Sequence, residues 1–113
     1  IAIAGTIAGT CEAIAYGKAN DLDTRKMLDS ISGGAAGSWQ LKNNGENILD
    51  GNLNPGFYIK HFIKDMKIAD DEAESKKLSL DILKDVLKMY QELEDEGMGD
   101  LGTQALIKHY SKK

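Results

Sequence analysis

The stretch FIKDMKIADDEA, residues 62–73, decides how this chain folds. Apolar residues recur along it, and just before it, at the three- and four-residue spacing of one helical face: Ile59, Phe62, Ile63, Met66, Ala69 and Ala73. This spacing predicts an amphipathic helix. The charged residues Lys60, Lys64, Lys67 and Asp71 share another face of it. That face is either solvated, with Lys67 and Asp71 as an i,i+4 ion pair, or the edge of a site.

Length and charge limit the class of protein. With 113 residues, 42% of them hydrophobic, the chain predicts one domain with a modest core. A formal net charge of −4 disfavours binding to nucleic acid, which depends on Lys and Arg. Cys11 is the only cysteine, so no intrachain disulfide can form, and a reducing compartment, the cytoplasm, is expected.

The first 20 residues, IAIAGTIAGTCEAIAYGKAN, predict a helix of small residues. Their uncharged run ends at Glu12, short of the roughly 18 to 20 apolar residues of a membrane-spanning helix. No basic region precedes the run, which also disfavours a signal peptide. Gly5 and Gly9 have a GxxxG spacing, expected to let another helix approach closely. Because no capping residue precedes Ile1, we expect the helix and the protein to begin upstream.

Turn and capping residues divide the remainder into about five more helices. Asp23 is expected to cap the second helix and Gly33 to end it, and Ser38 is expected to cap the third. Residues 50–57, DGNLNPGF, predict an exposed loop before the helix of the opening stretch. The sequence therefore predicts an all-α fold of about six helices.

The fifth helix is expected to begin at Ser79 or Asp81 and to end at Gly97, before a last helix over residues 103–113. Residues at helical spacing are predicted to face the core from this fifth helix: Ile82, Val86, Met89, Tyr90 and Leu93.

Most chemical motifs can be set aside. GMGDLG, residues 97–102, matches GxGxxG, but a helix and the acidic run ELEDE precede it instead of a strand. His61 and His109 are too far apart in sequence to indicate a metal site, so none is expected. Cys11 lies among small apolar residues, where a thiol usually packs. Trp39, the only tryptophan, is by default a core anchor, and a cleft wall is the alternative.

One segment carries a resemblance. KDMKIADD, residues 64–71, resembles the KDLGxAxD signature of the β-hydroxyacid dehydrogenases, the family of 3-hydroxyisobutyrate dehydrogenase and tartronate semialdehyde reductase, related to 6-phosphogluconate dehydrogenase. Lys64, Asp65, Ala69 and Asp71 match it, while Lys67 replaces its Gly. Further segments follow the order of that family's helical C-terminal domain: GTCEAIAYGKANDLD (9–23), GGAAGSWQL (33–41), NPGFYIKHFIKD (54–65) and DEGMGDLGTQALIKHY (95–110).

The resemblance implies a fold like the 6-phosphogluconate dehydrogenase C-terminal domain over residues 1–113. It also implies an N-terminal Rossmann domain outside this chain, and a catalytic Lys in a KxxxN motif just before Ile1. The fragment alone is then expected to be inactive. The intact protein is expected to transfer hydride between NAD or NADP and a short 3-hydroxy acid or its semialdehyde, of the 3-hydroxyisobutyrate or 2-hydroxy-3-oxopropionate type.

The same resemblance implies roles for five residues of this chain. Lys64, Asp65 and Asp71 are expected to bind the cofactor, and Ser38 and Trp39 the substrate. The expected partners are a small-molecule substrate, the protein's own Rossmann domain and further copies of itself, without nucleic acid or membrane. A non-enzymatic helical interaction module is the alternative.

Overall fold

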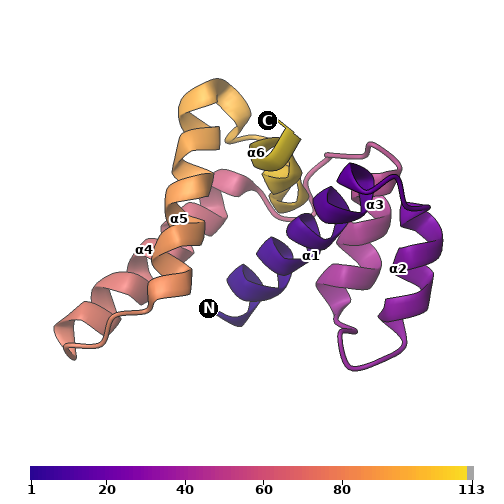
Figure 1. Cartoon of the computed structure of the whole chain (residues 1–113). Helices are drawn as coiled ribbons and strands as arrows, with labels where there is room; N and C mark the ends of the chain where they lie inside the picture. Colours follow the sequence, from indigo (N-terminus) through magenta and orange to yellow (C-terminus); the bar gives the residue numbers. More distant parts are fainter. Residues whose placement is uncertain (112–113) are drawn as a thin grey trace.

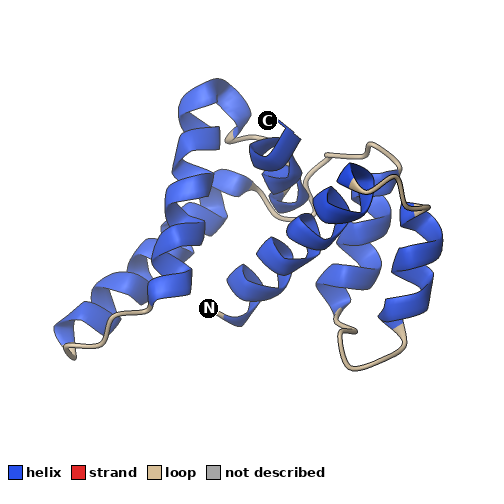
Figure 2. Cartoon of the chain, in the orientation of Figure 1, coloured by secondary structure: helices blue, strands red, loops and turns tan. Residues whose placement is uncertain are grey.

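The computed structural model describes residues 1–111, in which helices are joined by loops and turns (Figures 1 and 2). The elements of this part of the chain are the six α-helices α1 (Ala2–Ala19), α2 (Thr24–Ser32), α3 (Gly45–Leu49), α4 (Ile59–Ser75), α5 (Asp81–Leu93) and α6 (Ile107–Ser111), the π-helical turns η1 (Gln40–Asn44) and η2 (Glu94–Met98), and the 3₁₀-helix η3 (Thr103–Leu106). Within these residues, the predicted all-α fold is confirmed. The last two residues of the predicted final helix, 112–113, lie outside the described residues.

Helix α1 runs through the middle of the molecule (Figure 1). It contacts η1, α2 and α3 on one side and α5, α6 and η3 on the other. Helices α4 and α5 form an antiparallel arm that projects away from the rest. No helix among residues 1–111 has the length and apolar character needed to cross a membrane.

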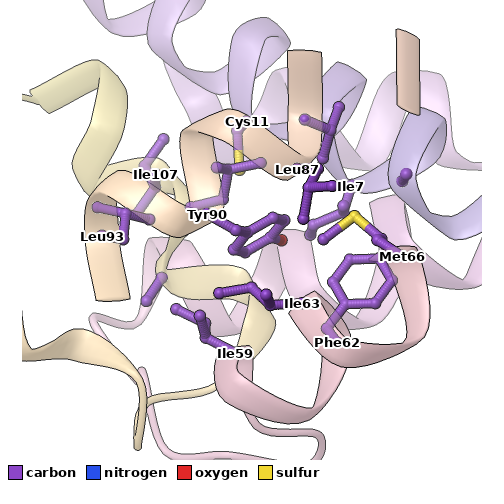
Figure 3. Packing of buried hydrophobic residues seen from close by; sticks show 14 of the residues in the cluster. Ile7, Cys11, Ile59, Phe62, Ile63, Met66, Leu87, Tyr90, Leu93 and Ile107 are labelled. Atoms are coloured by element: carbon purple, nitrogen blue, oxygen red, sulfur yellow. The ribbon is translucent and has the colours of Figure 1, made fainter. Parts of the chain in front are cut away.

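The core lies where α1, α4, α5 and the C-terminal helices meet. Tyr90 of α5 is completely buried, and its ring packs edge-on against Phe62 of α4 at 5.3 Å between centroids. Ile7 and Cys11 reach the same core from α1, and Figure 3 shows them around Tyr90 with Met66. The apolar face predicted for residues 59–73 is thus the face that α4 buries.

Several predicted helix ends are confirmed. Asp23 caps α2, because its Oδ1 accepts a hydrogen bond from the Lys26 amide at 3.1 Å, and α2 ends at Gly33. Gly97 adopts φ of 90°, a left-handed conformation that favours glycine, and ends the helical path beyond α5. This is a structural reason for a glycine of GMGDLG, as the sequence indicated.

The face predicted for the fifth helix was partly wrong. Ile82 is 69% exposed, and Leu83 is buried in its place. Consecutive helical residues point about 100° apart, so Leu83 shares the face of Val86 and Tyr90 at helical spacing while Ile82 does not. The helix begins at Asp81, after Leu80, with no side-chain cap.

The close helix approach predicted at Gly5 and Gly9 is also not observed. A Cβ atom built at either position meets no atom within 4 Å, and both residues are exposed. The close approach on α1 is at Gly17, where a Cβ would lie 2.9 Å from Sδ of Met27 in α2.

Candidate functional site

A cleft of about 670 Å³ opens beside the first residues of α1. Its walls come from α1, from the turn and π-helix around residues 39–47, from the start of α4 and from η3. The lining residues are Ile1, Ile3, Trp39, Gln40, Asn44, Asn47, Gly56, Phe57, Phe62, Asp65, Thr103 and Gln104. Three of them are aromatic and four are carboxamides, and the only ionisable side chain among the lining residues is that of Asp65. The cleft therefore combines apolar walls with neutral hydrogen-bonding groups.

The GSW turn presents Trp39 to this cleft. Ser38 Oγ accepts a hydrogen bond from the Leu41 amide at 2.9 Å, which confirms its predicted capping role. The Asn43 side chain donates to the Trp39 carbonyl at 3.1 Å. The indole of Trp39 is 66% exposed, so the core-anchor interpretation was wrong and the cleft-wall alternative is correct. Ser38 itself does not line this cleft, but it lines a shallower neighbouring hollow with Trp39.

Three carboxamides line one wall of the cleft, and sequence reasoning missed them. Asn44 Nδ2 donates to Gln40 Oε1 at 2.7 Å, and Asn47 Nδ2 donates to Asn44 Oδ1 at 3.2 Å. Gln104, in η3, donates hydrogen bonds from Nε2 to the main-chain carbonyls of Asn52 and Asn54, which hold its side chain in place. Residues 40, 44 and 47 are four and three positions apart, and this helical spacing is a sequence signal that could have placed Gln40, Asn44 and Asn47 on one face.

A separate groove of about 360 Å³ lies on the exposed side of α4. Its lining residues are Lys60, Ile63, Lys64, Lys67, Ile68, Asp71 and Glu94. The predicted common face of the three lysines and Asp71 is thus confirmed. We call this surface the lysine groove.

The charges of the lysine groove are not all paired. Lys60 is 2.5 Å from Asp100 Oδ1, and hydrogen bonding to that carboxylate raises the pKa of Lys60. Lys64 and Lys67 form no ion pair with any described residue, so the expected Lys67–Asp71 pair is absent. Two ammonium groups are therefore available to an anionic ligand.

The helix separates the residues expected to bind the cofactor. Lys64 and Asp71 line the lysine groove, whereas Asp65 lines the cleft with Trp39. No ion pair joins Lys64 to either aspartate in the described part of the chain. The motif KDMKIADD thus contributes to two different surfaces.

The remaining reactive groups have structural environments. Cys11 is fully buried, and burial raises the pKa of its thiol to about 12, which fits the packing role predicted for it. His61 is exposed and His109 half-buried. Among residues 1–111, no cluster of three or more potential metal ligands is found.

Comparison with known proteins identifies the family. Residues 1–110 match the family model described as NAD-binding of NADP-dependent 3-hydroxyisobutyrate dehydrogenase. The chain belongs to the 3-hydroxyisobutyrate dehydrogenase family. The resemblance inferred from KDMKIADD is therefore confirmed, and this chain is a helical domain of the β-hydroxyacid dehydrogenase family.

Relatives of this dehydrogenase domain are considerably longer. The uncharacterized oxidoreductase YkwC of Bacillus subtilis is 44% identical over 112 residues, which cover 99% of this chain and 39% of the relative. A probable 3-hydroxyisobutyrate dehydrogenase-like 1, mitochondrial, of Arabidopsis thaliana is 42% identical over 107 residues, covering 95% of this chain and 32% of the relative. The chain thus spans less than two fifths of the length of these relatives.

A solved structure supports the fold. The 3-hydroxyisobutyrate dehydrogenase (ygbJ) of Salmonella typhimurium superposes with a TM-score of 0.87 at 27% identity, over 94% of this chain and 38% of that chain. The predicted six-helix architecture of the family's helical domain is confirmed.

Proposed function

We propose that this chain is the C-terminal domain of an NAD(P)-dependent oxidoreductase that interconverts a short 3-hydroxy acid and its semialdehyde, of the 3-hydroxyisobutyrate or 2-hydroxy-3-oxopropionate type. The observation that carries the proposal is the cleft of about 670 Å³, lined by Trp39 and Asp65, in a chain of this family. A Rossmann domain elsewhere in the same protein would bind most of the cofactor. Substrate and cofactor would then meet between the two domains.

The lysine groove suits the cofactor. Lys64 and Lys67 carry ammonium groups without partners among the described residues, and phosphates of a nicotinamide dinucleotide are anions that such groups bind. We assign cofactor contact to Lys64, with Asp71 at the other end of the groove. The bound nicotinamide supplies the hydride chemistry.

The cleft suits the substrate. The indole of Trp39 offers a flat apolar wall, and the carboxylate of Asp65 can accept a hydrogen bond from a substrate hydroxyl. No lysine or arginine of the described chain lines the cleft, so the substrate carboxylate needs a cation from elsewhere. The catalytic Lys implied by the family resemblance, just ahead of Ile1, would adjoin this cleft because Ile1 lines it. Ser38 would not contact the substrate but would stabilise the turn that carries Trp39, through its hydrogen bond with the Leu41 amide.

We also propose that the full-length protein is a homo-oligomer. The α4–α5 arm carries three large apolar side chains, Ile68, Leu78 and Ile82, that are 54 to 69% exposed. Sedimentation of the full-length protein tests this. A monomer at micromolar concentration would contradict it.

The experiment compares oxidation of NADH and NADPH by the full-length protein with methylmalonate semialdehyde and tartronate semialdehyde. Replacing Lys64 with Ala should raise the cofactor KM or lower kcat about tenfold or more, because a charge-assisted contact is worth about 1.5 to 3 kcal/mol. Lys88→Ala, at an exposed position of α5 outside both surfaces, is the matched control. No turnover by the folded protein with either cofactor would favour the non-enzymatic interaction module. Unchanged kinetics of Lys64→Ala would remove Lys64 from the site.

A further inference from the structure

The three carboxamides of the cleft wall form a directed hydrogen-bonded chain, here called the amide ladder: Gln40, Asn44 and Asn47. Asn47 donates to Asn44, and Asn44 donates to Gln40, at 3.2 and 2.7 Å. Gln40 is only 9% and Asn44 only 6% exposed, so little solvent competes for them. Each amide therefore holds its neighbour in one orientation.

The amide ladder leaves some of its hydrogen-bonding groups free for a ligand. The carbonyl oxygens of Gln40 and Asn44 already accept hydrogen bonds within the ladder. Gln40 Nε2 donates a hydrogen bond to no described residue. This nitrogen is not fully buried, because every fully buried side-chain nitrogen or oxygen of the described chain has a partner. Because Gln40 and Asn47 both line the cleft, the ladder offers the amide hydrogens of Gln40 at one end and Asn47 Oδ1, which accepts from no described residue, at the other.

The rest of the cleft adds the carboxylate of Asp65, the hydroxyl of Thr103 and the carboxamide of Gln104, and no cation. Asp65 is the only ionisable side chain among its lining residues, and Ile3, Phe57 and Phe62 are apolar. A neutral wall of hydrogen-bond donors and acceptors beside one carboxylate matches a hydroxyl group, which can accept from an amide and donate to a carboxylate. A methyl group in the same place would leave the amide hydrogens unpaired after water is displaced.

The two substrate types of the proposed function differ at this one group. Glycerate and its semialdehyde carry a hydroxyl at carbon 2, whereas 3-hydroxyisobutyrate and its semialdehyde carry a methyl there. We infer that the amide ladder makes Gln40 and Asn44 specificity-determining residues that select the hydroxylated substrate over the methyl-branched one. The inference rests on the proposed function, because it assigns the substrate of that same cleft.

The test measures kcat/KM of the full-length protein for racemic glycerate and racemic 3-hydroxyisobutyrate with NAD and NADP. We expect wild type to prefer glycerate by at least about tenfold, because a site built to hydrogen-bond a hydroxyl discriminates against an analogue that lacks it. Asn44→Leu, of similar shape, should bring the ratio of the two values close to one. Gln40→Met changes the open end of the ladder and should act in the same direction.

The matched control is Asn20→Leu, the same exchange at the exposed end of α1, far from the cleft lining. It should leave the ratio unchanged. Partial unfolding lowers both kcat/KM values together, so a change in their ratio reports selectivity and not folding. Turnover with a preference for 3-hydroxyisobutyrate, or a ratio insensitive to both variants, overturns the role of the amide ladder but keeps the dehydrogenase. Absence of turnover with both substrates overturns the proposed function and this inference with it.

Discussion

The phenolic hydroxyl of Tyr90 donates a hydrogen bond to the main-chain carbonyl of Thr103 at 2.7 Å. Tyr90 belongs to the core, and Thr103 belongs to the lining of the cleft. The bond therefore joins α5 to η3, which lines the cleft together with the amide ladder. Burial raises the pKa of Tyr90 well above its ordinary value, so the hydroxyl keeps its proton and remains a donor.

Removing this hydroxyl should destabilise the fold. Tyr90→Phe leaves the Thr103 carbonyl without its donor inside the core, for which we expect a loss of about 1 to 3 kcal/mol in the free energy of unfolding. Urea denaturation followed by circular dichroism measures the loss. Tyr16→Phe, at a largely exposed position of α1, is the control and should change little. Equal stability of the two variants would show that the bond contributes nothing measurable.

Alkaline pH should destabilise the protein through Cys11. Its folded pKa is raised from 9.0 to about 12, so the unfolded chain loses the thiol proton first. The stability that this thiol contributes is full below pH 9 and is lost as the pH rises toward 12, by at most about 1.4 kcal/mol per pH unit.

The measurement compares wild type with Cys11→Ala by urea unfolding at pH 8 and pH 10. The wild type should lose more free energy of unfolding between the two pH values than the variant, because the variant lacks the titrating thiol. Identical losses would mean that Cys11 titrates normally in the folded protein. The same thiol should react with a disulfide reagent only when the protein unfolds.

Replacing Trp39 should separate function from stability. The side chain is 66% exposed, so Trp39→Ala is expected to change the free energy of unfolding by less than about 0.5 kcal/mol. The same change removes a wall of the cleft and should lower kcat/KM of the full-length protein at least about tenfold, a loss of about 1.4 kcal/mol in transition-state stabilisation. Tyr16→Ala, equally exposed but outside the cleft, should retain activity. If Trp39→Ala lowers the free energy of unfolding but not kcat/KM, Trp39 serves in packing and not in the cleft.

Two glycines should respond in opposite directions to alanine. Gly5→Ala adds a Cβ into open space within a helix and should stabilise the chain by about 0.5 to 1 kcal/mol. Gly45→Ala places a Cβ 2.9 Å from Cδ1 of Leu28, which is buried, and should destabilise it. Thermal unfolding of both variants checks the signs. Destabilisation by Gly5→Ala in the full-length protein would indicate that this face of α1 is covered by another surface.

The order and ends of the helices could be read from the sequence. Spacing of apolar residues placed the buried face of α4, and Asp23 and Ser38 were predicted as caps. Such signals act within a few residues along the chain, because helix caps and helical faces depend on local hydrogen bonds and on the 3.6-residue period. The family could be read from KDMKIADD for the same reason, since its residues are contiguous.

The composition of the two surfaces was decided by the tertiary structure. The sequence by itself determined that Lys64 and Asp65 point to different sides of α4, but only the tertiary structure decided that Asp65 enters the cleft of Trp39. The amide ladder likewise became a cleft wall only through Ile3 and Gln104, which are 101 residues apart in the chain and line the same space. Helical periodicity sets where a side chain points along its own helix. Which space it points into depends on the burial of apolar surface between segments distant in sequence, and no local pattern records that arrangement.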